Sequence, residues 1–143
     1  MKALGRFLTH HLTLRVLGLA IGAMLVYASL DKLTFPDRFA DVVHDYDMLP
    51  LALVNAFALA MPMVELVTGA ALILGAWRRA AGLLAAGLCG MFMVAIAQAL
   101  LRGLDIECGC FNVSGMSSTK ASWDLFVRDA GLLLASALVW RRG

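Results

Sequence analysis

The chain has 143 residues, of which 62% are hydrophobic and 15% charged, and its mean hydropathy is +0.84. A soluble domain carries roughly 25% charged residues, so this composition argues against an aqueous globular protein and favours a single membrane domain over 1–143. The formal net charge of +2 comes from basic residues in separate short segments. No basic stripe forms, so no nucleic-acid partner is expected.

Four segments are long and apolar enough to predict membrane-spanning helices, which need about 20 mostly apolar residues. The first covers about 12–33; it follows a basic N-terminus without a clean cleavage site, so we expect a retained helix rather than a signal peptide. The second covers 50–77, and the third, 80–101, has no charged residue. The fourth, 123–140, is the least apolar. The predicted fold is therefore an all-α bundle of four transmembrane helices.

The distribution of charge orients these helices. Basic residues without acidic ones occur before the first helix, in the turn at Arg78 and Arg79, and after Trp140. Most of the acidic residues lie in the two remaining connections, 34–49 and 102–122. Because segments rich in Lys and Arg stay in the cytoplasm, both termini are expected there, with 34–49 and 102–122 forming outer loops.

Small residues spaced four apart predict where helices approach one another closely. Such pairs occur in the first, third and fourth predicted helices. They are Gly18 with Gly22, Gly82 with Ala86 and Gly90, and Gly131 with Ala135.

The first outer loop has an amphipathic pattern, with Asp and Arg between apolar residues at roughly helical spacing. The apolar residues are Phe35, Phe39, Val42, Val43 and Tyr46. Pro36 suits the first turn of a helix. The pattern predicts a short interfacial helix on the membrane surface, between helices one and two. Such a helix would serve as a lid over the bundle or as a simple anchor for the loop, and the pattern does not decide between these roles.

The second outer loop contains the sequence Cys108-Gly-Cys110. Thiols on the outer face meet an oxidising compartment, and a disulfide between residues two apart closes a strained, readily reduced ring. The motif therefore favours thiol–disulfide exchange over a passive loop disulfide. It also favours exchange over half of a metal site, for which only His44 is an obvious further ligand. Cys89, in the middle of the third helix, is expected to be an apolar packing residue.

Glu65 lies near the middle of the second predicted span. A carboxyl group at that depth is costly and is by default a functional candidate. It could relay a proton, hydrogen-bond to a quinone or another carrier, or tie two helices together. A structural role would need a polar partner on a neighbouring helix, for which Gln98 and Tyr27 are candidates.

Arg128 and Asp129 interrupt the fourth predicted span. Only Ala130 to Trp140 is free of charge, which is too short to cross a membrane, so the helix must extend outward through the pair. We expect Arg128 and Asp129 to close a polar cluster with Asp31, Lys32 or Gln98. The alternative is that they tune the thiolate of one of the loop cysteines.

Short motifs in order along nearly the whole chain carry a family resemblance. They are Ser29-Leu-Asp-Lys-Leu33, Pro36-Asp-Arg-Phe39, Tyr46 to Pro50, Pro62-Met-Val-Glu65 leading to Gly69 and Gly75, Arg102-Gly, Cys108-Gly-Cys110-Phe111 and Arg128. The arrangement resembles the DoxX/MauE group of small membrane proteins, and the MauE (methylamine utilisation) branch in particular. The resemblance implies a four-helix bundle of the bacterial inner membrane. It also implies a link with a periplasmic thioredoxin-like partner and with disulfide formation in exported proteins.

The architecture is also similar to that of DsbB and vitamin K epoxide reductase, in which thiol electrons reach a quinone. Mapped onto this chain, only Cys108 and Cys110 can stand for the outer redox pair. The expected function is a membrane thiol–disulfide oxidoreductase or accessory subunit that exchanges electrons between a thioredoxin-like partner and a membrane carrier such as quinone. Glu65 would handle a proton or orient the carrier, and no covalent cofactor is expected. Two alternatives are a non-catalytic scaffold or assembly subunit and a quinone-linked thiosulfate oxidation subunit.

Overall fold

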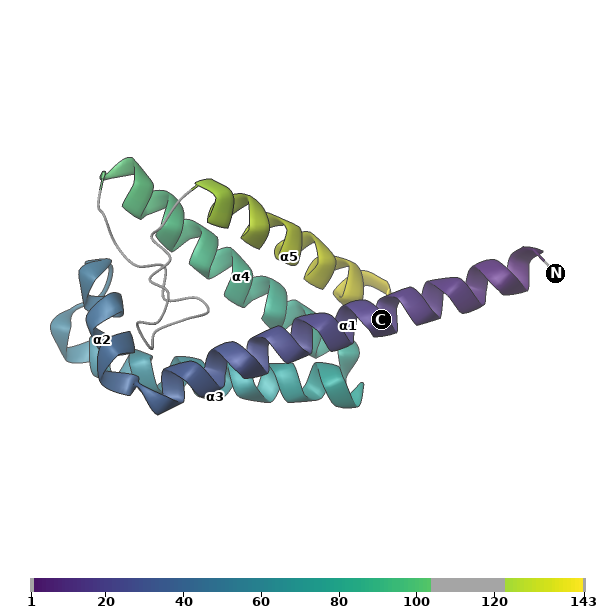
Figure 1. The fold of residues 1–143 in the computed structure, drawn as a ribbon, viewed down its shortest axis with the longest axis horizontal. Coiled ribbons are helices and arrows are strands. Elements are labelled where there is room, and N and C mark those ends of the chain that lie inside the picture. The colour runs from purple at the N-terminus through teal and green to yellow at the C-terminus, as the bar shows by residue number, and fades with distance from the viewer. Residues whose placement is uncertain (1, 104–122, 143) are drawn as a thin grey trace.

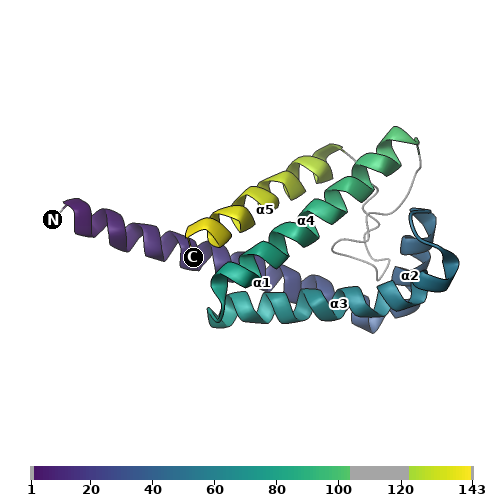
Figure 2. The same ribbon diagram turned by 180° about the vertical axis from the view of Figure 1, so that it is seen from behind.

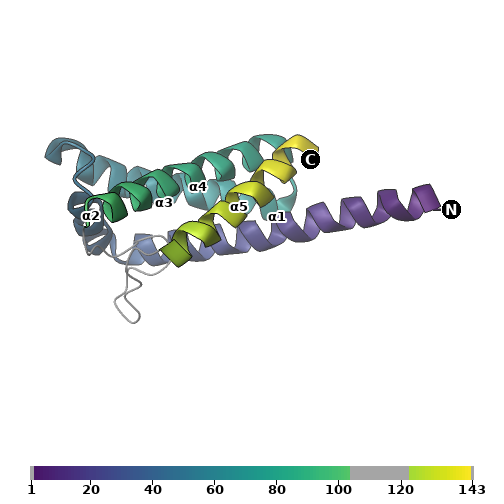
Figure 3. The ribbon, with the colours of Figure 1, turned by 90° about the horizontal axis from the view of Figure 1, so that it is seen from above.

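The computed structural model describes residues 2–103 and 123–142, which form five helices and short connections (Figure 1). The helices are α1 (Lys2–Thr34), α2 (Pro36–Asp45), α3 (Leu51–Leu74), α4 (Arg78–Leu101) and α5 (Trp123–Arg142). The most extensive contacts join α1 to α3 and α4 to α5 (Figures 1 and 2). The N-terminal part of α1 projects beyond the other helices (Figure 3).

Three of the described helices are long and apolar enough to cross a membrane: His10–Thr34 within α1, and the whole of α3 and α4. The chain is therefore a multi-pass membrane protein. The 20 residues of α5 run alongside α4 and, at 1.5 Å per residue, extend over about 30 Å. However, Arg128, Asp129 and the arginines of its last turn lower its hydropathy. The prediction of four spans is thus confirmed for three helices.

The turn between α3 and α4 begins earlier than the sequence predicts. Hydropathy extends the second helix to residue 77, but α3 ends at Leu74 because Gly75 adopts a left-handed conformation with φ of 73°. A left-handed residue commonly ends a helix in this way. Trp77 is also left-handed, with φ of 47°, and α4 starts at Arg78.

The short helix predicted in the first outer loop is α2, and its apolar face is directed toward the bundle. Phe39 and Val43 pack in one cluster with Val54 and Ala58 of α3 and Leu88 of α4. This face is therefore buried against protein, and α2 covers the end of the bundle (Figure 1).

Glycines allow two helix pairs to meet backbone to backbone. A Cβ atom added at Gly22 would lie 2.7 Å from the carbonyl oxygen of Gly69, and one at Gly69 would lie 2.8 Å from that of Gly22. A Cβ atom at Gly82 of α4 would lie 2.8 Å from the backbone nitrogen of Trp140 in α5. Close contact is also predicted at Gly131, but a Cβ atom there would meet nothing within 4 Å. These contacts fix α1 against α3 and α4 against α5.

Candidate functional site

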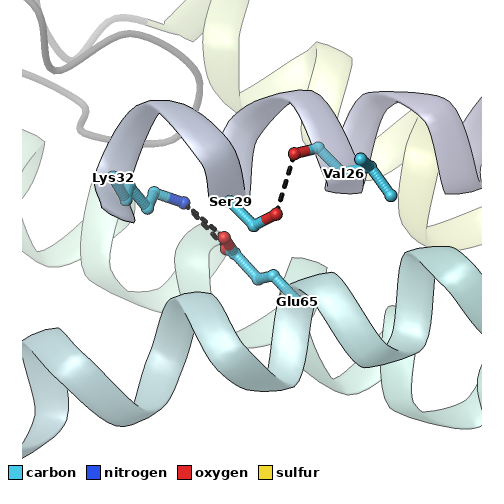
Figure 4. A network of polar contacts seen from close by, with 4 residues as sticks. All are labelled: Val26, Ser29, Lys32 and Glu65. Carbon is cyan, nitrogen blue, oxygen red and sulfur yellow. Dashed lines mark hydrogen bonds and ion pairs between the residues drawn. The ribbon is translucent and has the colours of Figure 1, made fainter. Parts of the chain in front are cut away.

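A buried ion pair joins α1 to α3 near the end covered by α2. The Nζ atom of Lys32 lies 2.8 Å from both Oε1 and Oε2 of Glu65 (Figure 4). The two side chains are 0% and 1% exposed. One turn before Lys32, the buried hydroxyl of Ser29 donates a hydrogen bond to the carbonyl of Val26 (Figure 4).

Two phenyl rings contribute further contacts to the Lys32 ammonium. Its Nζ lies 5.1 Å from the ring centroid of Phe39 in α2 and 4.8 Å from that of Phe92 in α4. A cation held at this distance over a ring is attracted by the electrons of the ring face, and the attraction is larger away from water. The carboxylate and the two rings together offset part of the energy needed to bury the charge. Four helices therefore converge on one ammonium group.

A small cavity of about 30 Å³ lies beside Glu65. Among the residues that line it are Phe92, Cys89 of α4 and Asp129 of α5. Asp129 is 3% exposed, and its Oδ1 atom lies 3.3 Å from Nη2 of Arg128, which is 38% exposed. The cavity therefore has Glu65 and Asp129 in one lining that is otherwise mostly apolar.

A larger, almost wholly apolar pocket of about 200 Å³ lies between α2, α3 and α4. Phe39 and Phe92, the rings that contact the Lys32 ammonium, both line it. Tyr46, Phe57, Met48 and Met91 also line it. The ion pair and the pocket therefore share two aromatic walls.

Glu65 has a different partner from those that the sequence suggests. Glu65 is paired with Lys32 rather than with Gln98, which is half-buried, or with Tyr27, which is 63% exposed. Arg128 and Asp129 contact each other, and Asp129 lines the same cavity as Glu65.

Two aromatic residues belong to the site without a clear signal in the sequence. The helical spacing of α2 marks Phe39 as an apolar position, but Phe92 lies in an unbroken apolar run that distinguishes no residue. Cys108 and Cys110 lie outside the described residues.

Comparison with known proteins gives the family. The family model described as methylamine utilisation protein MauE matches residues 10–142, nearly the whole chain. The chain belongs to the MauE family. It is 40% identical over 119 residues to the methylamine utilization protein MauE of Methylorubrum extorquens, covering 82% of this chain and 63% of that protein. It is 33% identical over 138 residues to the MauE of Paracoccus denitrificans, covering 96% of this chain and 73% of that protein.

The region matched by the MauE family includes every residue of the ion pair and of both cavities. This MauE-family chain aligns with less than two thirds of the length of the relatives from Methylorubrum extorquens and Paracoccus versutus, at 63% and 62%. No solved structure matches it.

Proposed function

We propose that this chain is a membrane thiol–disulfide oxidoreductase, or an accessory subunit of one, acting in methylamine utilisation. It would exchange electrons between a periplasmic thioredoxin-like partner and a membrane carrier such as quinone. The observation that carries the proposal is the buried Lys32–Glu65 pair beside an apolar pocket. The connection between α4 and α5 contains Cys108 and Cys110.

In the oxidising direction, the exchange begins at the Cys108–Cys110 disulfide. A thiolate of the partner attacks this bond and forms a mixed disulfide. The second partner thiol then displaces the mixed bond, so the partner gains a disulfide and the Cys108–Cys110 pair becomes two thiols. Two electrons and two protons would then leave those thiols as the disulfide re-forms, and a membrane quinone would be the acceptor of both.

Glu65 and Lys32 supply the polar groups that such chemistry needs inside an apolar bundle. Two protons accompany each pair of electrons, and Glu65 and Lys32 would be placed to receive or release them. Asp129 lines the cavity next to Glu65, and Arg128 links that carboxylate to the partly exposed surface. Gln98, half-buried on α4, is a further supporting residue.

The proposal includes α5 as a fourth span in the bacterial inner membrane, with both termini in the cytoplasm. The arginines at the start of α4 and at the end of α5 would then lie on the cytoplasmic side, as the positive-inside rule requires. Reporter fusions test this arrangement. Fusions after Arg79 and at Gly143 should read cytoplasmic and a fusion at Gly115 external, whereas a cytoplasmic reading at Gly115 would place the cysteines in a reducing compartment.

A mixed-disulfide trap tests the function. The Cys110→Ser variant should retain one reactive thiol at Cys108, form a covalent adduct with a thioredoxin-like protein, and yield a linked peptide in mass spectrometry. A variant with both loop cysteines replaced is the matched control and should capture nothing. If the wild-type protein, isolated without reductant, has two freely alkylated thiols at these positions, the scaffold function replaces the redox one.

A further inference from the structure

The apolar pocket between α2, α3 and α4 has the size and walls of a small-molecule site. We infer that it binds the ring of a membrane-soluble quinone, and that the Lys32–Glu65 pair orients two of its aromatic walls. This inference rests on the proposed function only for the redox use of the ligand. The binding itself is argued from the pocket.

The size of the pocket fits one ring. A cavity of about 150 Å³ lined by apolar side chains accommodates benzene, so a pocket of about 200 Å³ admits a six-membered ring with small substituents. Four of its lining residues are aromatic: Phe39, Tyr46, Phe57 and Phe92. Aromatic side chains and methionine sulfur make favourable contacts with a flat ring. An acyl chain would fill the same volume without using these faces.

The charge behind the walls is complementary to a ligand with electron-rich oxygens. The positive end of the ion pair is the end that contacts Phe39 and Phe92, since both ring centroids lie about 5 Å from Lys32 Nζ. Glu65 lies on the other side, where it lines the smaller cavity. The pocket wall therefore has a buried cation behind it, which favours carbonyl oxygens and the addition of electrons to the ring. The Glu65 carboxylate at 2.8 Å offsets most of this charge, so the pocket faces the positive end of a buried dipole.

Part of the pocket wall is exposed. Phe57 and Met91 lie on α3 and α4, two of the helices apolar enough to cross a membrane, and both are partly exposed. Met48, in the connection between α2 and α3, is 43% exposed. Exposure on α3 and α4 would let a ligand dissolved in lipid reach the pocket.

Photolabelling of the full chain in nanodiscs tests the site. The probe is a short-chain benzoquinone bearing an azide, and the wild-type protein should be labelled on peptides from α2 or from the Met91–Ala95 part of α4. Ala95→Phe places a ring in the pocket, whereas Ala80→Phe, at an exposed position near the start of the same helix, is the matched control. The first should weaken binding by roughly ten-fold or more, a change of about 1.4 kcal/mol. The control should leave binding unchanged.

The outcomes separate this inference from the proposed function. Labelling away from the pocket, or labelling equal in Ala95→Phe and wild type, overturns the inference even if Cys108 and Cys110 exchange with a dithiol. Labelling in the pocket without thiol exchange leaves the quinone site standing and removes the oxidoreductase function. Labelling of the pocket by a phospholipid with an azide on its acyl chain, with no labelling by the quinone, assigns the pocket to an acyl chain and overturns the inference. If Ala95→Phe fails to fold, the positions labelled in the wild-type protein decide whether the quinone binds in the pocket.

Discussion

Removing one partner of the Lys32–Glu65 pair should destabilise the bundle strongly. A lone carboxyl group in the second span would predict that Glu65→Leu is harmless or stabilising. The structure reverses that expectation, because leucine would leave the Lys32 ammonium buried without its counter-ion. Lys32→Met should also destabilise the bundle, because it would leave the Glu65 carboxylate buried without its counter-ion.

The magnitude follows from the burial of the pair. Both side chains are essentially inaccessible, at 0% and 1% exposure, so solvent screening provides no relief. Breaking a buried pair by removing one partner typically costs about 3–5 kcal/mol. At about 2–4 °C per kcal/mol for a chain near this size, the melting temperature should fall by roughly 10 °C. Replacing both partners by apolar residues is often neutral or stabilising, so the Lys32→Met/Glu65→Leu double variant should recover most of the loss.

The assay is thermal unfolding of the four proteins in one lipid or detergent, arranged as a double-mutant cycle. A large coupling energy between the two positions is the expected result. Glu65→Gln should fall between wild type and Glu65→Leu, because the amide oxygen still accepts a hydrogen bond from Nζ without compensating its charge. Additive losses, or single variants as stable as wild type, would show that the two side chains do not depend on each other.

Three further outcomes follow from single contacts. Gly69→Ala should lower stability by about 1–3 kcal/mol, because its Cβ would meet a backbone oxygen. Gly87→Ala is the control: a Cβ atom there would meet nothing within 4 Å, so this variant should be neutral or stabilising in the same thermal assay. Arg128→Ala should lower the melting temperature much less than Lys32→Met, since partly exposed ion pairs contribute about 0–1 kcal/mol. An equal fall in melting temperature for the two variants would show that Arg128 belongs to the core. Cys89→Ala should preserve thiol exchange, and native Cys89, 8% exposed, should react slowly with alkylating reagents; loss of exchange would give this thiol a redox role.

Much of the fold could be predicted because hydropathy and charge depend on local sequence. The apolar runs of α3 and α4 and the helical spacing of α2 each lie within a few turns of chain. The end of α3 is misplaced by hydropathy because Gly75, in an otherwise apolar stretch, stops the helix by its backbone conformation rather than by polarity. The burial of the apolar face of α2 also depends on tertiary contacts, since the same amphipathic pattern suits a membrane surface or a protein surface.

The candidate site was only half predictable. Glu65 is conspicuous because a carboxyl group in a long apolar run is rare. Lys32 is not conspicuous, because it lies in the last turn of α1 next to a polar loop, where a lysine normally extends to the membrane surface. Whether it turns inward depends on the register of α1 against α3, and that register is fixed by the contact between Gly22 and Gly69. Because these two glycines lie far apart in the chain, the sequence alone does not reveal that they are in contact.

The contact between α1 and α3 also bears on the role of the Lys32–Glu65 pair. Backbone contact at Gly22 and Gly69 already holds α1 against α3, so an ion pair is not required to join these helices. Buried pairs are, in addition, poor stabilisers compared with apolar residues of similar volume. Their particular property is a proton and a charge held at a fixed position away from water. In this protein that position is behind the aromatic walls of a ring-sized pocket. The placement supports the proposal that the pair contributes chemistry to the pocket rather than strength to the bundle.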